Sequence, residues 1–205
     1  MVLEKHTRIR IDLEVIVNLI DDRSKVLDLG CGEGELLEAL IREKHCTGHG
    51  VEIHNQLICG CIEKGVDVIH GDIDEGLGDY PDQFFDFVVL SRTLQVVHKP
   101  DILLKEIVRV GRMGIVSFPN FGHLSIRSQI FLNGRMPVTQ TLPFEWYNTP
   151  NIHLLTVKDF IDYCKKHSLK IIKQIYIGKR EKSHIFINLL PTLFAEQAVF
   201  MITRK

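Results

Sequence analysis

Short apolar runs alternate with amphipathic segments over residues 1–120, and this alternation restricts the fold more than any other feature of the chain. The runs that predict strands are residues 25–30, 47–53, 66–72, 84–93 and 113–120. The segments with helical spacing are residues 9–19, 33–44, 55–65 and 101–110. Strands that alternate with helices pair in parallel, and their right-handed crossovers leave few topologies. The pattern therefore predicts an α/β fold with a doubly wound, mostly parallel sheet.

A long irregular segment at about residues 121–155 interrupts the alternation. It begins with a short amphipathic helix and contains three prolines. Segments this long inside a compact domain are usually lids or binding elements, unless they are disordered. Its aromatic residues Phe144, Trp146 and Tyr147 argue against disorder. We interpret it as an insert, either a lid or a docking surface, within one domain that spans residues 1–205.

The alternation resumes after the insert. A helix is predicted from about Thr156, which forms a capping-box-like pair with Asp159. Apolar runs at residues 170–178 and 195–205 predict an antiparallel hairpin at the sheet edge, which makes a seven-stranded sheet. Ligands of such sheets bind beyond the carboxyl ends of the parallel strands. Most of the chemically interesting residues are therefore expected on one rim.

The stretch "VLDLGCGEGE" (residues 26–35) lies between the first strand and the helix that follows it. A dinucleotide-binding loop needs G-x-G-x-x-G, but Gly34 comes one position early and Glu35 stands where the third glycine belongs. Glu33 and Glu35 would repel a pyrophosphate. At about 4 Å and an effective dielectric of about 20, each contact would cost roughly 4 kcal/mol. The loop therefore favours a nucleoside ligand that carries no phosphate.

S-adenosylmethionine is such a ligand, because it carries a sulfonium, an ammonium and a carboxylate. Glu52, at the end of the second strand, is placed to accept hydrogen bonds from both ribose hydroxyls. Asp72, after the third strand, can accept from the adenine amino group, with Ile73 against the ring. Alternatively, Glu33 and Glu35 are first-turn acids that favour the helix dipole, and Asp72 is a turn residue or N-cap. The order of these features along the chain favours the ligand.

The same stretches are similar to the motifs of a known family. "VLDLGCGEGELL", "GVEI", "VIHGDIDEGL" and "FDFVVLSRTLQVV" resemble the successive motifs of class I S-adenosylmethionine-dependent methyltransferases. The more specific segment "GRMPVTQTLPFEWYNTPNIHLLTVKDF" resembles the methionine biosynthesis protein MetW family, and the likeness covers nearly the whole chain. It implies a Rossmann-like methyltransferase domain, with S-adenosylhomocysteine as product. The residues predicted to bind the cofactor are Asp28, Gly30, Cys31, Gly32, Gly34, Glu52, Ile53, Asp72, Ile73, Ser91 and Gln95.

The likeness leaves two functions open. In the first, the protein is an S-adenosylmethionine-dependent methyltransferase that acts on a small molecule. In the second, it is a non-catalytic, S-adenosylmethionine-sensing subunit of homoserine O-acyltransferase (a MetX-like partner), with the insert as docking surface. A nicotinamide-dependent reductase is a weaker third reading, because the glycine loop lacks the required spacing.

No residue stands out as a catalyst. The segment after the fourth strand, "LSRTLQ", lacks the N/D-P-P-Y/F motif of enzymes that methylate nucleic-acid amino groups. The weak candidates lie in the insert. His123 or His153 can act as a base or can simply cap a helix or bond loop backbone, and Arg127 can hold a substrate carboxylate or pair at the surface. Tyr147, beside Trp146, is a lid residue, an interface anchor or core. Further candidates for substrate contact are Arg135, Glu145, Trp146 and Asn148.

Composition excludes several classes of function. Lys and Arg number 25 and Asp and Glu 26, so bulk charge gives no support for nucleic-acid binding. No apolar run approaches the roughly 18–20 residues that span a bilayer, and residues 1–20 do not resemble a signal peptide. The five cysteines show no zinc spacing, and Cys31 is interpreted as a small filler of the glycine loop. We therefore expect a cytoplasmic protein with reduced thiols and no metal.

Overall fold

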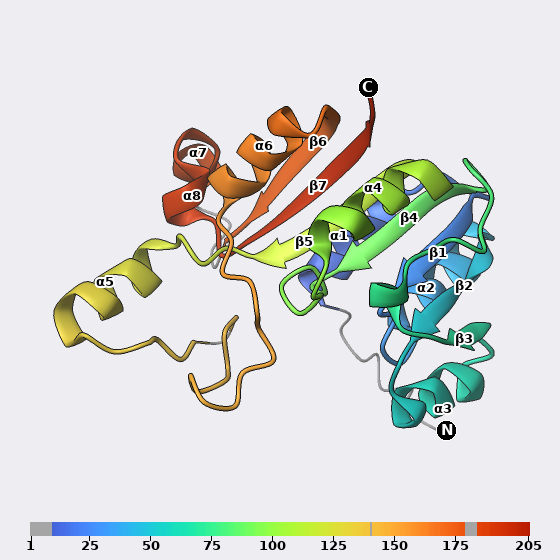
Figure 1. Ribbon diagram of the computed structural model, residues 1–205, viewed down its shortest axis with the longest axis horizontal. Helices are drawn as coiled ribbons and strands as arrows, with labels where there is room; N and C mark the ends of the chain where they lie inside the picture. Colours follow the sequence, from blue (N-terminus) through green and yellow to red (C-terminus); the bar gives the residue numbers. More distant parts are fainter. Residues whose placement is uncertain (1–9, 140, 179–183) are drawn as a thin grey trace, which may run out of the picture.

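A seven-stranded sheet forms the centre of the computed structural model, which describes residues 10–139, 141–178 and 184–205 (Figure 1). In spatial order the strands are β3 (Val68–His70), β2 (Thr47–Glu52), β1 (Lys25–Leu29), β4 (Phe85–Ser91), β5 (Gly111–Pro119), β7 (Gln197–Arg204) and β6 (Leu169–Ile177). β1 to β5 pair in parallel, whereas β7 pairs antiparallel with both β5 and β6. The predicted α/β class, the mostly parallel sheet and the antiparallel C-terminal strand pair are confirmed.

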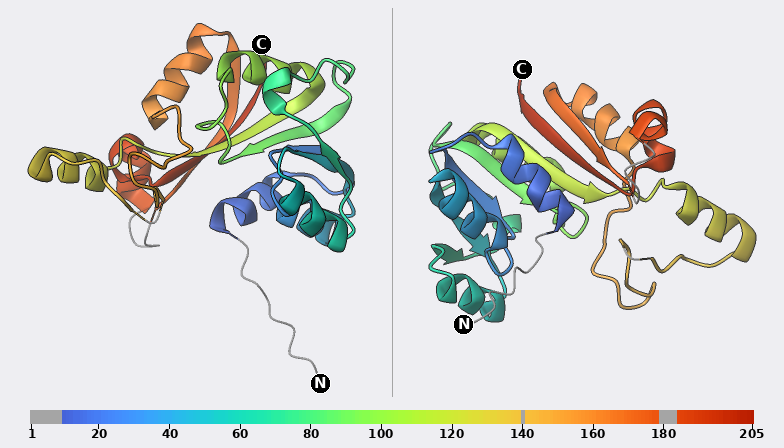
Figure 2. Two further views of the ribbon diagram at one scale, coloured as in Figure 1. Left: turned by 60° about the horizontal axis from the view of Figure 1, so that its bottom comes forward. Right: turned by 180° about the vertical axis from the view of Figure 1, so that it is seen from behind.

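Helices cover both faces of the sheet, as Figure 2 shows from two sides. They are α1 (Ile11–Leu19), α2 (Glu35–Lys44), α3 (Asn55–Glu63), α4 (Pro100–Val110) and α6 (Val157–Lys166). Successive residues of a strand point to opposite faces. In β4, Phe87 and Val89 pack with buried residues of α1 and α2, whereas Val88 and Leu90 pack with those of α4 and α6. The near-continuous apolar runs of the sequence are explained by burial on both faces.

The segment predicted as an insert projects away from the sheet (Figures 1 and 2). It contains α5 (Leu124–Asn133), and the described residues from 134 to 156 form no further helix or strand. The helix predicted after it is α6, and its N-terminus carries the full capping box of Thr156 and Asp159. None of the helices in the described ranges is long and apolar enough to cross a membrane.

Three short helices were not predicted. The 3-10 helix η1 (Ile73–Glu75) follows β3, and α7 (His184–Leu189) and α8 (Pro191–Phe194) lie between β6 and β7. Each spans six residues or fewer, which is too short for a 3.6-residue period to be recognised. The predicted start of the first helix, residue 9, lies outside the described residues.

Candidate functional site

A crevice opens where β1, β2, β3 and β4 end, on the rim that the sequence predicts. Its main part has a volume of about 530 Å³, and a smaller adjoining hollow has about 250 Å³. Both parts are lined by Arg10, Gly30, Gly32, Leu57 and Ser91. The acids Glu33 and Glu35 line the smaller hollow, where they would repel a phosphate. Glu33 also lies 3.5 Å from the ammonium group of Lys64.

The glycine loop after β1 forms one wall of the crevice. Gly30, Gly32 and Gly34 have φ angles of 69°, 58° and 76°, which other residues adopt only with strain. A Cβ atom on Gly30 would come within 2.9 Å of the Thr93 hydroxyl oxygen, so Gly30 is also required for packing. Gly32 has open space beside it and lines both hollows. The loop therefore lets a ligand approach its backbone closely.

The Glu52 carboxylate, at the end of β2, is buried and already bonded to backbone groups. Its Oε2 accepts from the N–H of Gly32 at 2.9 Å, and its Oε1 accepts from those of Ile53 and His54 at 2.9 Å each. A carboxylate has about four lone-pair positions. One position, on Oε2, is therefore open to a ligand hydroxyl, and a bond to a second ribose hydroxyl would require one backbone bond to be exchanged.

Asp28, in β1, is a buried carboxyl group on the wall of the smaller hollow. It has no hydrogen-bond partner among the residues that the structure describes. Burial raises its pKa to about 7; the Arg10 guanidinium opposes this rise and the Glu52 carboxylate adds to it. A carboxyl group in this state is suited to a cationic ligand group, which would stabilise its ionised form.

The predicted adenine contacts lie at the β2 and β3 ends of the main hollow. Asp72 is the N-cap of η1, where its Oδ1 accepts from the Asp74 N–H at 2.9 Å, so the N-cap interpretation is confirmed. Asp72 also lines the crevice, together with the apolar side chains of Ile53 and Ile73. Its capping role leaves Oδ2 for a ligand. A planar, apolar group with a hydrogen-bond donor would fit here.

Asp74 also lines the crevice, but its carboxylate is occupied. It accepts from the backbone N–H groups of His98 and Lys99 at 2.9–3.1 Å and lies 3.1 Å from His98 Nδ1. Although burial raises the pKa of Asp74, these hydrogen bonds outweigh that effect and lower it. Asp74 therefore fixes η1 against the residues that lead into α4.

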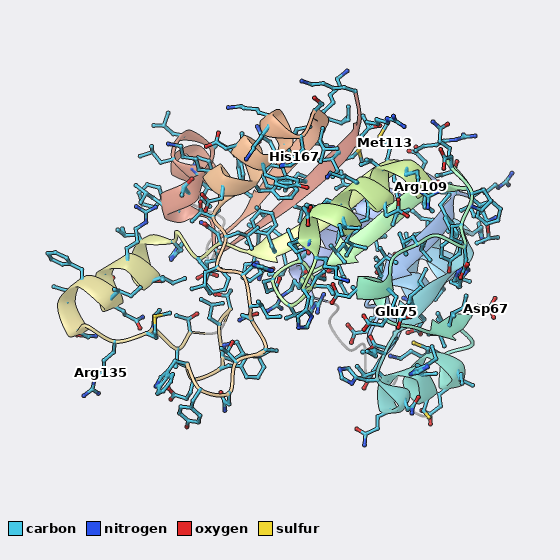
Figure 3. The ribbon with its side chains drawn as sticks, viewed as in Figure 1. Asp67, Glu75, Arg109, Met113, Arg135 and His167 are labelled. Atoms are coloured by element: carbon cyan, nitrogen blue, oxygen red, sulfur yellow. The ribbon has the colours of Figure 1, made fainter. Side chains whose placement is uncertain are left out.

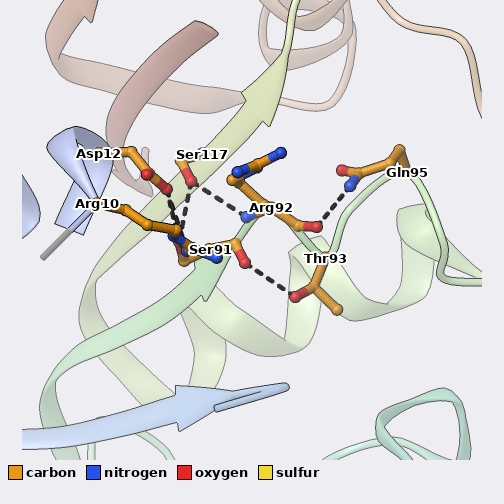
Figure 4. A network of polar contacts seen from close by, with 7 residues as sticks. All are labelled: Arg10, Asp12, Ser91, Arg92, Thr93, Gln95 and Ser117. Carbon is orange, nitrogen blue, oxygen red and sulfur yellow. Dashed lines mark hydrogen bonds and ion pairs between the residues drawn. The ribbon is translucent and has the colours of Figure 1, made fainter. Parts of the chain in front are cut away.

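A polar network that the sequence did not predict lies at the end of β4 (Figure 4). Arg10, just before α1, donates to Asp12 Oδ2 at 3.2 Å and to Ser91 Oγ at 3.1 Å. Ser91 Oγ in turn donates to the buried Asp12 and lies 3.2 Å from Ser117 Oγ. Arg10 and Arg92 both line the crevice. Predicted residue Ser91 is thus part of a network that brings two arginines to the site.

Two predicted cofactor contacts serve other roles in this structure. Burial is the main cause that raises the pKa of the Cys31 thiol, which stays neutral, 3.9 Å from Cys61 Sγ. Cys31 lines the smaller hollow as an apolar group. The Gln95 side chain is buried and its amide donates to the Arg92 carbonyl oxygen; Gln95 lines neither hollow. A cofactor contact by either residue stays a prediction.

Two of the four weak catalytic candidates hold the chain around α5. His123 is the N-cap of α5, where its Nδ1 accepts from the Ser125 N–H at 3.2 Å. The Arg127 Nε donates to the carbonyl oxygen of Gly122 at 2.7 Å. Both observations favour the structural interpretation of these side chains, helix capping for His123 and a backbone contact for Arg127.

The other candidates also lie outside the crevice. The Nε2 atom of His153 is buried without a hydrogen-bond partner in the described residues, and His153 lines a separate hollow of about 240 Å³ beside α4 and α6. Tyr147 is 70% exposed and packs edge-on against Trp146. Arg135, labelled in Figure 3, points away from the body of the molecule. These side chains are not placed to act on a molecule in the crevice.

The insert reaches the crevice through Pro150 and Ile152, which complete its outer wall. The N–H groups of Ile152 and His153 donate to the Gln95 carbonyl oxygen at 2.8 and 3.0 Å, which ties the insert to the loop after β4. Within the described ranges, no group of three or more His, Cys, Asp or Glu side chains could hold a metal ion. The crevice is lined by the backbone of the glycine loop, several carboxylates, two arginines, two histidines and apolar side chains.

Comparison with known sequences agrees with the motifs. The model of the family described as "Methionine biosynthesis protein MetW" matches residues 10–202. The "Bifunctional methionine biosynthesis protein MetXA/MetW" of Rhodopirellula baltica is 36% identical over 207 residues, which cover 96% of this chain and 33% of that protein. The chain therefore spans about a third of the length of this curated relative.

Comparison with solved structures supports the fold. A SAM-dependent methyltransferase from Archaeoglobus fulgidus superimposes with a TM-score of 0.68 at 18% identity, over 94% of this chain and 91% of that chain. An S-adenosylmethionine-dependent methyltransferase from Mesorhizobium loti gives 0.67 at 13% identity, over 93% and 96% of the two chains. At these identities the likeness establishes a methyltransferase-like fold.

Proposed function

This chain belongs to the methionine biosynthesis protein MetW family, and we propose that it binds S-adenosylmethionine and transfers the methyl group to a small molecule. One observation carries the proposal. The glycine loop, whose glycines have left-handed φ angles, borders a crevice with the acidic groups Asp28, Glu33 and Glu35. These groups disfavour a phosphate and suit a cationic ligand. The methyltransferase-like fold supports the proposal as well.

The distribution of charge in the crevice suggests how the ligand lies. Its adenosine end fits the β2 and β3 side, where Glu52 and Asp72 offer carboxylate oxygens and Ile73 an apolar surface. Its methionine end fits the β1 and β4 side. There the Asp28 carboxyl would bind the ammonium group, and the Arg10 guanidinium would bind the carboxylate.

When bound, S-adenosylmethionine supplies an electrophilic methyl carbon, to which the acceptor's lone pair forms a bond while the C–S electron pair stays on sulfur. An acceptor atom that carries a proton releases it to water. Neither of the predicted bases, His123 and His153, lines the crevice, and we assign to the crevice residues the positioning of the two reactants. Orientation alone accounts for large rate gains in such displacements.

A calorimetric titration tests the ligand before any chemistry is assumed. We expect S-adenosylmethionine to bind and NADH, which carries a pyrophosphate, not to bind. Saturable binding of NADH in place of S-adenosylmethionine would overturn the proposal, because the acids beside the glycine loop would then not select the ligand.

The proposed role of Asp28 predicts that affinity depends on pH. The empty protein holds a proton on Asp28 below a pKa of about 7, whereas a bound ammonium group favours the ionised carboxylate and lowers the pKa. Affinity should therefore be constant just above pH 7 and fall by up to about tenfold per pH unit below it. Calorimetry near pH 6 in buffers of different ionisation enthalpy should record about one proton released per ligand bound.

The Asp28→Asn variant is the control for this effect, because its amide has the shape of the protonated acid and cannot ionise. It should bind more weakly above pH 7 and show no proton release near pH 6. A variant that retains the pH dependence of the natural chain would assign the titration to another group.

A second candidate function is supported by the surface of the insert. Phe131, Leu132, Trp146 and Tyr147 are 87%, 75%, 73% and 70% exposed, and exposed apolar and aromatic groups of this kind are typical of interfaces. The Rhodopirellula relative carries MetXA and MetW in one chain. The alternative proposal is therefore that the insert docks on a MetX-like homoserine O-acyltransferase, with S-adenosylmethionine as a sensed effector.

The two functions separate in one assay. The protein is mixed with S-adenosylmethionine, homoserine, acylhomoserine and the acyltransferase, and methyl transfer and acyl transfer are followed separately. Formation of S-adenosylhomocysteine with one acceptor supports the methyltransferase. The accessory subunit is supported if acyl transfer depends on this protein and no S-adenosylhomocysteine is formed. In that case the Trp146→Ser variant should no longer support acyl transfer.

A further inference from the structure

Arg92, the first residue after β4, has a strained backbone. Its φ angle is 54°, in the left-handed region that is unfavourable for a non-glycine residue. Hydrogen bonds at both the N–H and the carbonyl oxygen of Arg92 hold this conformation. Its N–H donates to Ser117 at the backbone oxygen (2.9 Å) and at Oγ (3.1 Å), and its carbonyl oxygen accepts from the Gln95 amide. Strained residues held in this way cluster at functional sites.

The Arg92 side chain lines the main hollow and is half-buried, yet its guanidinium has no hydrogen-bond or ion-pair partner among the described residues. Figure 4 shows the contrast, because the dashed lines to Arg92 all reach its backbone. Burial lowers the pKa of Arg92, the positive Arg10 lowers it further, and Asp12 opposes both. Arginine nevertheless stays charged. A charge partly removed from water, with its donors unused, favours an anionic ligand.

Two positive charges lie close together at the corner of the crevice that Arg92 lines. Among the described residues, Arg10 and Arg92 are two cations that repel each other here, and the acid that acts on Arg92 is Asp12, which Arg10 already contacts at 3.2 Å. The proposed cofactor brings one carboxylate, which Arg10 can bind. Arg92 is then left facing the remaining space between the end of β4 and Ile152 of the insert. A second anionic group would complete the site.

We propose that Arg92 binds a carboxylate of the methyl acceptor, so that the substrate class is a small carboxylic acid. The proposal rests on the proposed function, since it assigns the place next to S-adenosylmethionine to the acceptor. The planar guanidinium can hold a carboxylate through two parallel hydrogen bonds. Arg92 is on this reading a binding residue that determines specificity, and the reacting atom of the acceptor lies elsewhere in the molecule.

Calorimetry on the protein saturated with S-adenosylhomocysteine tests this with matched probes. Succinate offers carboxylates on a short chain, and succinamide has the same shape without charge. We expect succinate to bind and succinamide not to bind. The Arg92→Gln variant should bind succinate about tenfold or more weakly than the natural chain does. Its affinity for S-adenosylhomocysteine should change less than about twofold. Since glutamine has a similar backbone preference, this variant removes the charge without changing the strain.

Arg10→Gln is the matched variant, and it should reduce the affinity for S-adenosylhomocysteine by about tenfold or more. Absence of succinate binding to the natural chain, or equal binding of succinamide, would overturn the proposal. So would an Arg92→Gln variant that keeps its succinate affinity or that loses S-adenosylhomocysteine as strongly as Arg10→Gln. If the natural chain does not bind S-adenosylhomocysteine, the proposed function fails, and succinate titrated into the empty protein still tests Arg92 separately.

Discussion

Replacing Glu52 with alanine should abolish most S-adenosylmethionine binding and also destabilise the empty protein. The carboxylate accepts three backbone N–H groups at 2.9 Å, from Gly32, Ile53 and His54, and faces the crevice with its open Oε2 position. A ligand hydrogen bond to a charged group contributes about 1.5–3 kcal/mol, which is roughly 10- to 100-fold in affinity. Each N–H that stays buried without a partner costs about 1–3 kcal/mol of stability.

Two measurements on two variants separate these effects. Calorimetry gives the affinity, and urea denaturation gives the free energy of unfolding. Glu63→Ala removes an exposed carboxylate at the end of α3 and should change neither quantity. Loss of stability in Glu52→Ala with unchanged affinity would restrict Glu52 to holding the glycine loop and would contradict the proposed ribose contact.

The rim of the crevice was predictable because its signals are local. Gly30 directly follows β1, Glu52 is the last residue of β2 and Asp72 comes two residues after β3, and the carboxyl ends of parallel strands share one edge of a sheet. The parallel pairing of the strands can be predicted from the alternation of strands and helices alone. These residues could therefore be placed together without knowing any contact between distant parts of the chain.

The polar network around the two arginines could not be found in this way. Arg10 contacts Ser91 across 81 positions, a distance bridged only when α1 packs beside β4 and β5. Arg92 lies within the motif "FDFVVLSRTLQVV", but its backbone strain depends on hydrogen bonds to Ser117 of β5 and from Gln95 of the loop after β4. Catalytic candidates were chosen from the insert by residue type alone, and the direction in which an irregular segment leaves the sheet has no sequence signal.

The largest stability effect that we expect comes from replacing Gly48 with alanine, because of the register of β2 on β1. Gly48 pairs with Val26 of β1 and has a φ angle of 149°. A Cβ atom there would lie 1.8 Å from the Val26 carbonyl oxygen and 2.7 Å from its carbonyl carbon. The clash is with backbone atoms, so it cannot be relieved by the rotation of a side chain. β1 also has a neighbouring strand on each side, which restricts its movement. The free energy of unfolding should fall by more than about 4 kcal/mol.

The effect should extend to binding, because β1 leads into the glycine loop and β2 ends in Glu52, so strands forced apart would separate the two walls of the crevice. Gly78→Ala is the control: a Cβ atom at Gly78 meets nothing within 4 Å, and its stability should match the natural chain in urea denaturation. A Gly48→Ala protein within about 1 kcal/mol of the natural chain, by the same measurement, would contradict the register of β1 on β2, since a Cβ atom 1.8 Å from a carbonyl oxygen must force the two strands apart.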